Sequence, residues 1–438
     1  MDLILNDSDI PKCTNQKYCH LIRKDYEIYA YDPFLIFVAK ANICSLKTEK
    51  IKRTFKSDPW NILKTIFNNY KKEYARFANI GFEIGSILAL GYGLGDYSYK
   101  NIKAKSGYDN KNIPDLIAFF PSKYFVINKK SGNNQMISLL VNEVIREAHA
   151  KNTDLKNSTQ KKNTIYSNFT KEKYCKAVKS VRGFIKKGDV YQTNIAQTFS
   201  GCSNKKWEDI FDLFKNNSET PYSTLINMRD YQIMTCSPER FLKRSGDTII
   251  SQPIKGTSPR KKYKNLDNIS YNNLISSQKE EAELAMIVDL VRNDLSISSL
   301  PGTVKVEEFK KVESFPNVHH LVATVSAKVK SSYNSIDIIR NAFPPASVTG
   351  CPKIRAMEII AEIERAKRGF YCGAIGSYGY NGDFDLSMAI RTALTVPLKK
   401  CIKFYYSAGS GIVLDSTPKN EYKETLHKAK PFLEAIQE

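Results

Sequence analysis

The sequence of 438 residues contains no run of 18 or more apolar residues, so it predicts no membrane-spanning helix. It does not begin with a basic segment followed by an apolar one, so we expect no signal peptide. None of its nine cysteines forms a CxxC pair, which argues against a zinc site and a disulfide framework. Together these absences favour a cytoplasmic protein with reduced thiols and no membrane partner.

The charge is strongly basic, with 66 Lys and Arg against 45 Asp and Glu and a net charge of +21. The basic residues are spread along the whole chain, and only short clusters stand out, at Lys50–Lys56 and Arg260–Lys264. Because no recognition motif accompanies them, nucleic-acid binding is a remote alternative. We expect part of the charge to favour an anionic substrate.

Helical periodicity is clearest in three segments, Pro59–Ala75, Lys171–Lys187 and Gln278–Ser296. The second is followed by Gly188, a natural helix C-cap. A further helix is expected to begin near Pro418. The third segment carries one apolar stripe, formed by Leu284, Ile287, Val288, Val291 and Leu295.

Strand-like runs occur at Phe34–Val38, Tyr124–Ile127 and Val190–Phe199. The stretch Gly373–Val413 contains the hairpin signal Asn381-Gly382 and predicts an antiparallel meander. Strands grouped in this way, with helices between them, favour an α+β fold.

One lysine lies in an unusual turn. Lys255 is held between Pro253 and Gly256, directly after the strand-like run Thr248–Ile250. A lysine acts as a nucleophile only when its amine is neutral, and at an ordinary pKa only about one in a few thousand is neutral at pH 7. Burial or a nearby cation would lower that pKa. The alternative is an ordinary exposed lysine.

Two pairs of carboxylates stand three residues apart on predicted helices. Glu280 and Glu283 form the first pair, and Glu421 and Glu424 form the second. If the two helices meet, their oxygen donors suit Mg²⁺. If they do not meet, the pairs are two solvated helix faces.

Eight motifs follow one another in the order found in chorismate-utilising enzymes, the family of anthranilate synthase component I. The resemblance covers about residues 170–438 and is carried by GDVYQTNIAQ, SPERF, PIKGT, AELAMIVDLVRNDLS, SVTGCPKIRAMEII, RGFYCGAIG, MAIRT and AGSGIVLDSTPKNEYKETLHKA. It implies large antiparallel β-sheets packed as a sandwich, with helices outside and the active site in the cleft between the sheets.

The resemblance also implies roles for individual residues. Lys255 would add to C2 of chorismate, and Glu239 would protonate the leaving C4 hydroxyl as general acid. Mg²⁺ would be held by Glu283 and Glu424, with Glu280 and Glu421 acting through waters. The substrate would be bound by Thr257, His320, Ser347, Thr349, Tyr371, Arg391, Gly409, Gly411 and Lys428. Without the resemblance, Glu239 is as well explained by solvation or by pairing with Arg240.

Within the family, the turn resembles that of the aminodeoxychorismate synthases, which read PIKGT where anthranilate synthases read PIAGT. Isochorismate and salicylate synthases have a lysine where this chain has Gln192, which argues against water as the nucleophile. The resemblance therefore implies that chorismate and ammonia give 4-amino-4-deoxychorismate, for para-aminobenzoate and folate synthesis. No glutaminase motif is present, so ammonia would come from a glutamine amidotransferase subunit. An anthranilate synthase large subunit is the alternative.

The N-terminal third departs from the family pattern. The effector-binding motif of the family is not evident in Val38–Asn42, although Pro221-Tyr222 matches its companion motif. The usual AGGG reads Ala408–Gly411, with Ser410 in the third position. We expect residues 1–150 to contribute strands to the same core, 151–167 to form a polar linker, and 168–438 to form the chorismate-binding domain.

Overall fold

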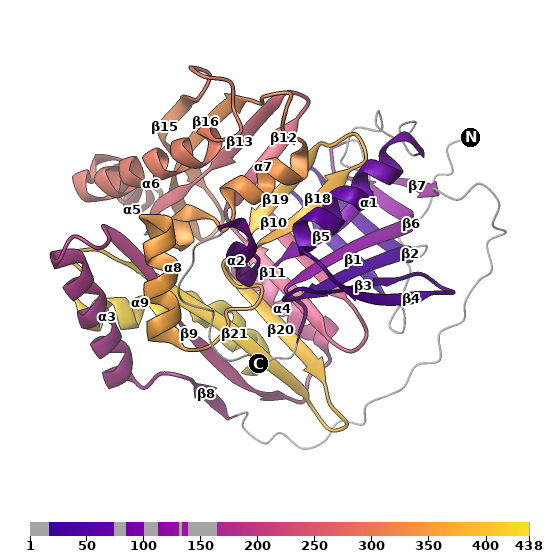
Figure 1. Ribbon diagram of the computed structural model, residues 1–438. Helices are drawn as coiled ribbons and strands as arrows, with labels where there is room; N and C mark the ends of the chain where they lie inside the picture. The colour runs from indigo at the N-terminus through magenta and orange to yellow at the C-terminus, as the bar shows by residue number, and fades with distance from the viewer. Residues whose placement is uncertain (1–16, 74–84, 100–112, 131–133, 139–163, 438) are drawn as a thin grey trace.

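The computed structural model describes residues 17–73, 85–99, 113–130, 134–138 and 164–437 (Figure 1). The strands are β1 (Tyr18–Ile22), β2 (Tyr26–Lys40), β3 (Ile43–Lys47), β4 (Lys52–Lys56), β5 (Gly85–Leu90), β6 (Leu116–Asn128), β7 (Asn134–Ser138), β8 (Ile165–Ser167), β9 (Gln192–Ser203), β10 (Tyr222–Asn227), β11 (Gln232–Ser237), β12 (Arg240–Ser245), β13 (Thr248–Gln252), β14 (Ile254–Pro259), β15 (Lys305–Ser314), β16 (Val318–Lys328), β17 (Gly350–Cys351), β18 (Ala374–Gly379), β19 (Phe384–Met388), β20 (Thr392–Pro397) and β21 (Ile402–Ile412).

The helices agree closely with the periodicity of the sequence. They are α1 (Pro59–Glu73), α2 (Gly95–Ser98), α3 (Lys171–Lys186), α4 (Trp207–Ser218), α5 (Lys264–Ser276), α6 (Gln278–Ser296), α7 (Ser335–Ala342), α8 (Lys353–Glu364) and α9 (Pro418–Gln437), with 3₁₀ turns η3 (Tyr92–Leu94) and η4 (Ala346–Val348). The predicted helices at α3, α6 and α9 are confirmed, and residues 74–75 of the first predicted helix lie outside the described residues.

All the strand pairs are antiparallel, and they join into one continuous network with two branches. One branch runs β8-β9-β21-β20-β11-β10-β1, and the other runs β14/β15-β16-β13-β12-β19-β18-β5. Both branches end on the long pair β2 and β6, whose register shifts between Pro33 and Leu35. In Figure 1 these N-terminal strands lie at the right, with β18 and β19 above and β11 and β20 below.

The two branches share one hydrophobic core. Ile233 of β11 and Leu386 of β19 belong to the same cluster of buried side chains, which also contains Ile28 of β2 and Ile87 of β5. Burial of this apolar surface is the main force that holds the layers together. The expected α+β fold with packed antiparallel sheets is confirmed, and the sandwich is built from one network folded over at β2 and β6.

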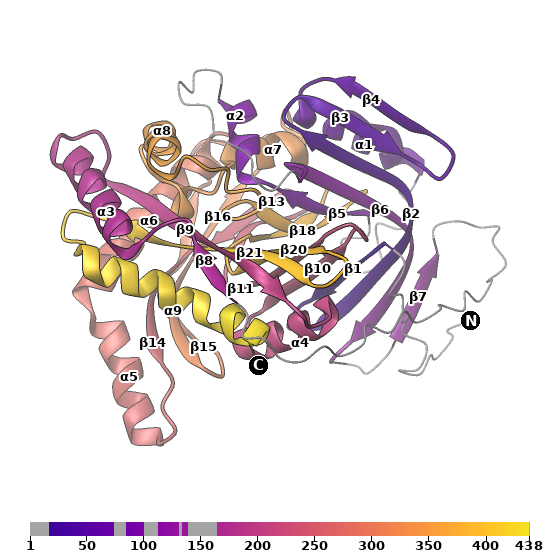
Figure 2. The same ribbon diagram turned by 90° about the horizontal axis from the view of Figure 1, so that it is seen from below.

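The helices cover the outer faces of this sandwich. Helix α6 packs on β14 and β16, α8 packs on β9, and α9 lies along β21 with α3 and α4 beside it (Figure 2). The apolar stripe predicted for α6 is buried as expected, and its N-cap Ser277 accepts a hydrogen bond from the backbone N–H of Glu280. No described helix is long and apolar enough to cross a membrane.

The meander expected over Gly373–Val413 is wrong in part. Strands β18 and β19 pair, as do β20 and β21, but β19 pairs with β12 whereas β20 pairs with β11. The two hairpins therefore lie in different branches. The chain crosses between them at Arg391, whose φ of +48° is in the left-handed region.

The N-terminal strands pair directly with strands from the rest of the chain. β1 pairs with β10, and β5 pairs with β18. Most of the predicted linker 151–167 lies outside the described residues, and its last three residues form β8.

Candidate active site

Lys255 lies on β14 at a β-bulge. It pairs with Leu321 of β16, whereas Thr257 pairs with the next residue, His320, so that Gly256 is an extra residue on β14. Gly256 has a φ of +75°, and a Cβ there would lie 3.0 Å from the Glu280 carboxylate. Only glycine fits this position without strain. The bulge therefore explains the turn seen in the sequence, and it places β14 against α6.

The Lys255 side chain is partly buried, and its amine faces Gly411 of β21. A Cβ on Gly411 would come within 3.8 Å of Lys255 Nζ. Burial lowers the pKa of Lys255, and the nearby Lys428 cation lowers it further. The carboxylates of Glu239, Glu283 and Glu424 raise this pKa and so oppose the shift. This is the environment that raises the neutral fraction of an amine.

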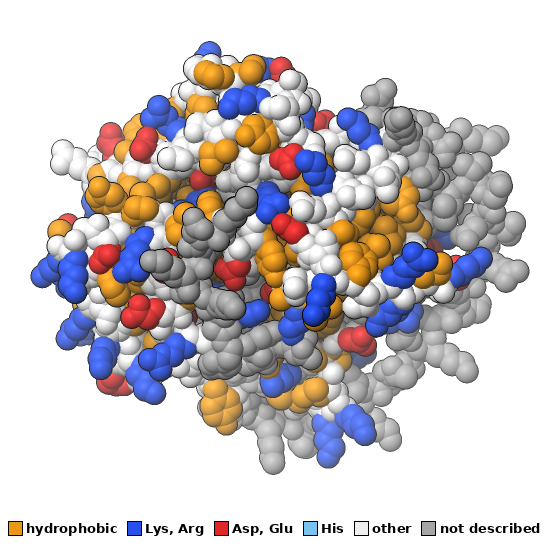
Figure 3. All heavy atoms as spheres, in the orientation of Figure 1, with side chains coloured by type: hydrophobic (Ala, Val, Ile, Leu, Met, Phe, Trp, Pro, Cys, Tyr) orange, Lys and Arg blue, Asp and Glu red, His pale blue; other side chains and the backbone are white. Residues whose placement is uncertain are grey.

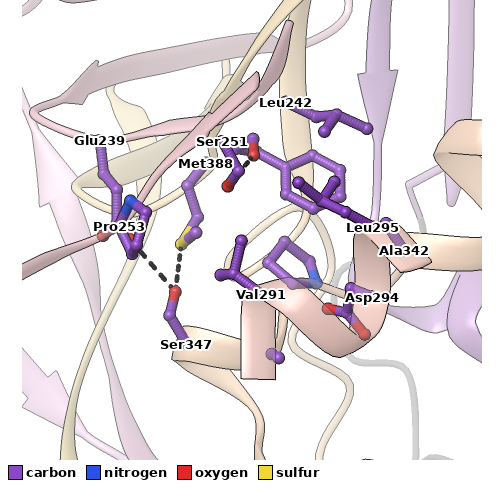
Figure 4. Close-up of a pocket in the computed structure, with 13 residues that line it drawn as sticks. Glu239, Leu242, Ser251, Pro253, Val291, Asp294, Leu295, Ala342, Ser347 and Met388 are labelled. Carbon is purple, nitrogen blue, oxygen red and sulfur yellow. Dashed lines mark hydrogen bonds between the residues drawn. The ribbon is translucent and has the colours of Figure 1, made fainter. Parts of the chain in front are cut away.

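Glu239 lies in the connection between β11 and β12 and is only 4% exposed. Its Oε1 accepts a hydrogen bond from the Ile254 backbone N–H at 3.4 Å. It accepts a second from the Ser347 hydroxyl at 3.1 Å (Figure 4). Burial raises its pKa to about 7, even though Lys255 and these two hydrogen bonds oppose the shift. A carboxyl with this pKa is half protonated at neutral pH and can act as a general acid.

A small cavity lies beside Glu239, with Asp294 on its opposite side (Figure 4). Most of its lining is apolar, which explains why the Glu239 carboxyl is poorly solvated. Burial raises the pKa of Asp294 to about 6, and Lys353 Nζ binds its Oδ1 at 2.6 Å. This ion pair ties α6 to the start of α8. The lining consists of Glu239, Phe241, Leu242, Ser251, Pro253, Val291, Asp294, Leu295, Ala342, Pro345, Ala346, Ser347 and Met388.

A second group of predicted residues surrounds His320. The Thr257 hydroxyl and His320 Nδ1 lie 3.1 Å apart. Burial lowers the pKa of His320 to about 4, and the nearby Arg391 cation contributes. The imidazole is therefore neutral at pH 7, and it can donate one hydrogen bond and accept another. Burial also lowers the pKa of Arg391.

The backbone of β21 forms another part of the candidate site, together with Lys428 and Tyr371. Lys428 of α9 donates a hydrogen bond from Nζ to the Gly409 carbonyl at 3.1 Å. A Cβ on Gly409 would lie 2.9 Å from the Tyr371 hydroxyl, so the tyrosine is in close contact with this strand. Glycine is needed here because the two groups approach so closely.

Ser347 of η4 and Thr349, the residue directly after η4, enclose the site. Thr349 is fully buried, and its hydroxyl donates to the Pro345 carbonyl at 2.8 Å. Its backbone carbonyl accepts from the Asn194 N–H on β9 at 2.9 Å. In this structure Thr349 therefore fixes the loop, whereas Ser347 contacts Glu239.

The four predicted metal ligands lie on α6 and α9. Burial raises the pKa of Glu280, the neighbouring Glu283 raises it further, and Glu424 also contributes. Burial likewise raises the pKa of Glu421, with Glu424 adding to the shift. The carboxylates of the two helices thus influence one another's charge, as they must if the two helices meet.

These carboxylates are not gathered into a coordination shell. No group of three or more His, Cys, Asp or Glu in the described part of the chain lies close enough to hold a metal ion. Glu424 instead pairs with Lys428 at 2.6 Å, and Glu283 lies 3.8 Å from Lys279. The oxygen donors fit Mg²⁺ chemically. Binding of Mg²⁺ by these four glutamates therefore stays a prediction.

The structure adds residues that sequence reasoning left out of the site. Gln192 is 2% exposed, and its Nε2 has no hydrogen-bond partner among the described residues. It lies against Gly411, because a Cβ there would be 2.9 Å from Nε2. Arg368 binds Glu364 at 2.6 Å and lies 5.8 Å from the centre of the Tyr371 ring. Their four-residue spacing was the only sequence signal for this pair.

Comparison with known proteins identifies the family. Residues 19–434 match the family described as chorismate binding enzyme. The chain belongs to this family. Aminodeoxychorismate synthase component 1 of Escherichia coli K12 is 33% identical over 431 residues, covering 95% of this chain and 93% of that protein. The protein is thus a chorismate-utilising enzyme, and the family resemblance of its motifs is confirmed.

Anthranilate synthases also resemble the chain. Anthranilate synthase component 1 of Acetivibrio thermocellus is 30% identical over 438 residues, covering 94% of this chain and 87% of that protein. The crystal structure of anthranilate synthase component I from Streptococcus pneumoniae TIGR4 matches with a TM-score of 0.79 and 27% identity, covering 93% of this chain and 92% of that one. The fold is therefore that of anthranilate synthase component I.

Proposed function

We propose that this enzyme converts chorismate and ammonia to 4-amino-4-deoxychorismate, the precursor of para-aminobenzoate. The observation that carries the proposal is the position of Lys255, whose amine faces Gly411 and shares its surroundings with Glu239. A relative named aminodeoxychorismate synthase component 1, with matching coverage, supports the same assignment. Nine cysteines without a CxxC pair favour a cytoplasmic location as part of this proposal.

In this reaction the neutral Lys255 amine adds to C2 of chorismate, and the double bond shifts as the C4 oxygen leaves. Glu239 donates its proton to that oxygen, so water is released. Ammonia then adds to C4, the double bond returns, and the C2–Nζ bond to Lys255 breaks. The lowered pKa of Lys255 and the raised pKa of Glu239 favour the protonation states that the first step needs.

The two carboxylates of the substrate need cationic and polar partners. Arg391, which lies near His320, and Lys428, which binds the Gly409 carbonyl, would supply the cations. Tyr371 and the β21 backbone at Gly409 and Gly411 would supply the polar contacts. Neutral His320 and Thr257 would contact the ring. The planar guanidinium of Arg391 matches a carboxylate better than an ammonium does.

Mg²⁺ is part of the proposal as a bound cofactor. Glu283 and Glu424 would hold it directly, and Glu280 and Glu421 would hold it through waters. When bound, it supplies positive charge that neutralises and orients the ring carboxylate. Ammonia would come from a glutamine amidotransferase subunit, because the matching relatives carry the name component 1.

Product identification tests the assignment. The protein is incubated with chorismate, MgCl₂ and ammonium, and the products are separated with and without an added lyase that forms 4-aminobenzoate. We expect 4-aminobenzoate only when the lyase is present. Fluorescent anthranilate formed without the lyase would instead assign the protein to anthranilate synthase, the alternative favoured by its similarity to those enzymes.

The basic charge supports the binding of an anionic substrate better than that of a nucleic acid. On the face shown in Figure 3, the Lys and Arg side chains are dispersed among acidic ones. Nucleic-acid binders gather basic residues on one face or along one groove. Tight, salt-sensitive DNA binding without chorismate turnover would reverse this conclusion.

A further inference from the structure

Two cysteines outside the active site lie side by side on the surface. Cys202 is near the end of β9, and Cys401 directly precedes β21. Lys403 of β21 pairs with Cys202, so Cys401, two residues earlier, is the diagonal neighbour of Cys202 on the same face. The Cys401 thiol is within hydrogen-bonding reach of the Cys202 thiol. Cys401 lies in the turn before β21, where its carbonyl accepts a hydrogen bond from the Leu398 backbone N–H at 2.8 Å.

The surroundings of this pair favour thiol chemistry. Cys202 is exposed and Cys401 is partly exposed, whereas Cys19, Cys44, Cys236 and Cys372 are buried. Three exposed lysines flank the turn in the sequence. Reactive cysteines occupy partly exposed, electropositive sites of this kind, whereas buried cysteines are inert. The flanking lysines are Lys399, Lys400 and Lys403.

The two thiols differ in a way that sets the order of reaction. Burial raises the pKa of Cys401 to about 11, and its hydrogen bond with Cys202 adds to the shift. Cys401 therefore keeps its proton at neutral pH. Cys202, as the exposed thiol, meets a dissolved reagent first.

We propose that Cys202 and Cys401 form a reversible dithiol–disulfide pair that exchanges with a small anionic disulfide, such as oxidised glutathione. The Cys202 thiolate attacks one sulfur of the small disulfide and releases one small thiolate. Cys401 then loses its proton to solvent, attacks the Cys202 sulfur and releases the second small thiolate. The protein loses two hydrogens, and one small disulfide becomes two thiols.

The disulfide bond would join β9 to β21 far from the candidate active site. Ile402 pairs with Ser203 at this end of the two strands, and Gly411 pairs with Asn194 at the other. Nine residue steps separate the two ends, which is about 30 Å along a strand. We therefore expect oxidation to leave turnover of chorismate unchanged and to stabilise the fold.

The test uses the full-length protein incubated with oxidised glutathione. We expect its intact mass to fall by two hydrogens, and peptide mapping to join the peptides of Cys202 and Cys401. Cys401→Ser should stop at a mixed disulfide on Cys202, and Cys202→Ser should give neither product. Cys175→Ser, which changes a partly buried cysteine on α3, is the matched control and should behave like the wild type.

Two results would overturn the proposal. One is a wild-type protein that keeps all its hydrogens after this treatment. The other is a wild-type protein that retains a mixed disulfide at Cys202. The oxidised protein should also show an unfolding midpoint raised by about 2 °C or more, reversed by dithiothreitol. An unchanged midpoint would show that the bond does not tie the strands together.

Discussion

The two sides of the candidate active site are built differently. Lys255 and Glu239 are placed by strands and their connections, and Glu239 is 4% exposed with two hydrogen bonds to its carboxylate. The four glutamates lie on helices and are more exposed, and Glu424 is 46% exposed and paired with Lys428. The side proposed to form and break bonds is therefore the more rigid one. The side proposed to bind the ion can rearrange at lower cost, because its side chains keep contact with water.

The largest effect is expected on the rigid side. Lys255→Ala should lower the amination rate by about 10³-fold or more, because no other amine occupies the bulge. The rate of 4-amino-4-deoxychorismate formation from ammonium measures it. Lys262→Ala, at an exposed lysine seven residues later, is the control and should retain full activity. A fully active, folded Lys255→Ala variant would refute a covalent role.

Glu239→Gln should lower kcat by about 10²-fold or more, since the amide has no proton to give. The pKa of Glu239 is raised to about 7, so its acid form is lost as the pH rises through 7. The wild type should therefore show kcat/KM falling above about pH 7, and the variant should not show this limb. Glu308→Gln, at an exposed carboxylate, is the control. An unchanged alkaline limb in Glu239→Gln would assign the limb to another group.

On the adjustable side, Glu424→Gln should raise the Mg²⁺ concentration needed for half-maximal activity by about 10- to 100-fold, with kcat restored at high Mg²⁺. Glu434→Gln, on the same helix and paired only with Lys430, should leave this concentration unchanged. Titration of activity with MgCl₂ distinguishes the two. Equal responses of both variants would contradict the predicted metal site.

Gly411→Ala tests the close approach of β21 to the lysine. Its Cβ would lie 2.9 Å from Gln192 Nε2 and 3.8 Å from Lys255 Nζ, so we expect kcat/KM to fall by about tenfold. Gly183→Ala is the control. It lies in α3 with nothing within 4 Å of the added methyl group, and it should raise the free energy of unfolding by about 0.5–1 kcal/mol without changing activity. Full activity in Gly411→Ala would place the lysine elsewhere during turnover.

The smallest effect is a change in pH dependence. Ser347→Ala removes a hydrogen bond that stabilises the ionised form of Glu239, so the pKa of Glu239 should rise further. The alkaline limb of kcat/KM should move up by about 0.5–1 pH unit, because such a bond contributes about 1 kcal/mol. A shift in the opposite direction would show that Ser347 does not donate to this carboxylate.

Much of the fold was predictable because its signals are local. The periodic apolar stripe of α6 and the capping residues of α3 and α9 depend on neighbouring residues only. The crossing at Arg391 was not predictable in this way. Two hairpins in one stretch of sequence look alike whether they pair with each other or with distant strands. Only the pairing of β19 with β12 and of β20 with β11 separates them.

The site was predictable to a different extent. Motif order selected Lys255, Glu239 and the glycines of β21, and the structure brings these residues together. The substrate-binding role of Ser347 stays a prediction, and sequence reasoning did not foresee that its hydroxyl donates a hydrogen bond to Glu239. It considered Gln192 only as the counterpart of a lysine in related synthases, and it did not predict the contact of this side chain with Gly411 across the strand pair. Such contacts depend on register, which sequence pattern alone does not set.

The pairing of β1 with β10 and of β5 with β18 has a practical consequence. A fragment beginning at Thr164 would keep every residue proposed for catalysis. It would nevertheless leave β10 and β18 as open edges with unpaired backbone groups. Exposed edges of this kind recruit strands from other chains. We therefore expect such a fragment to aggregate, and the N-terminal strands to act as protection against self-association.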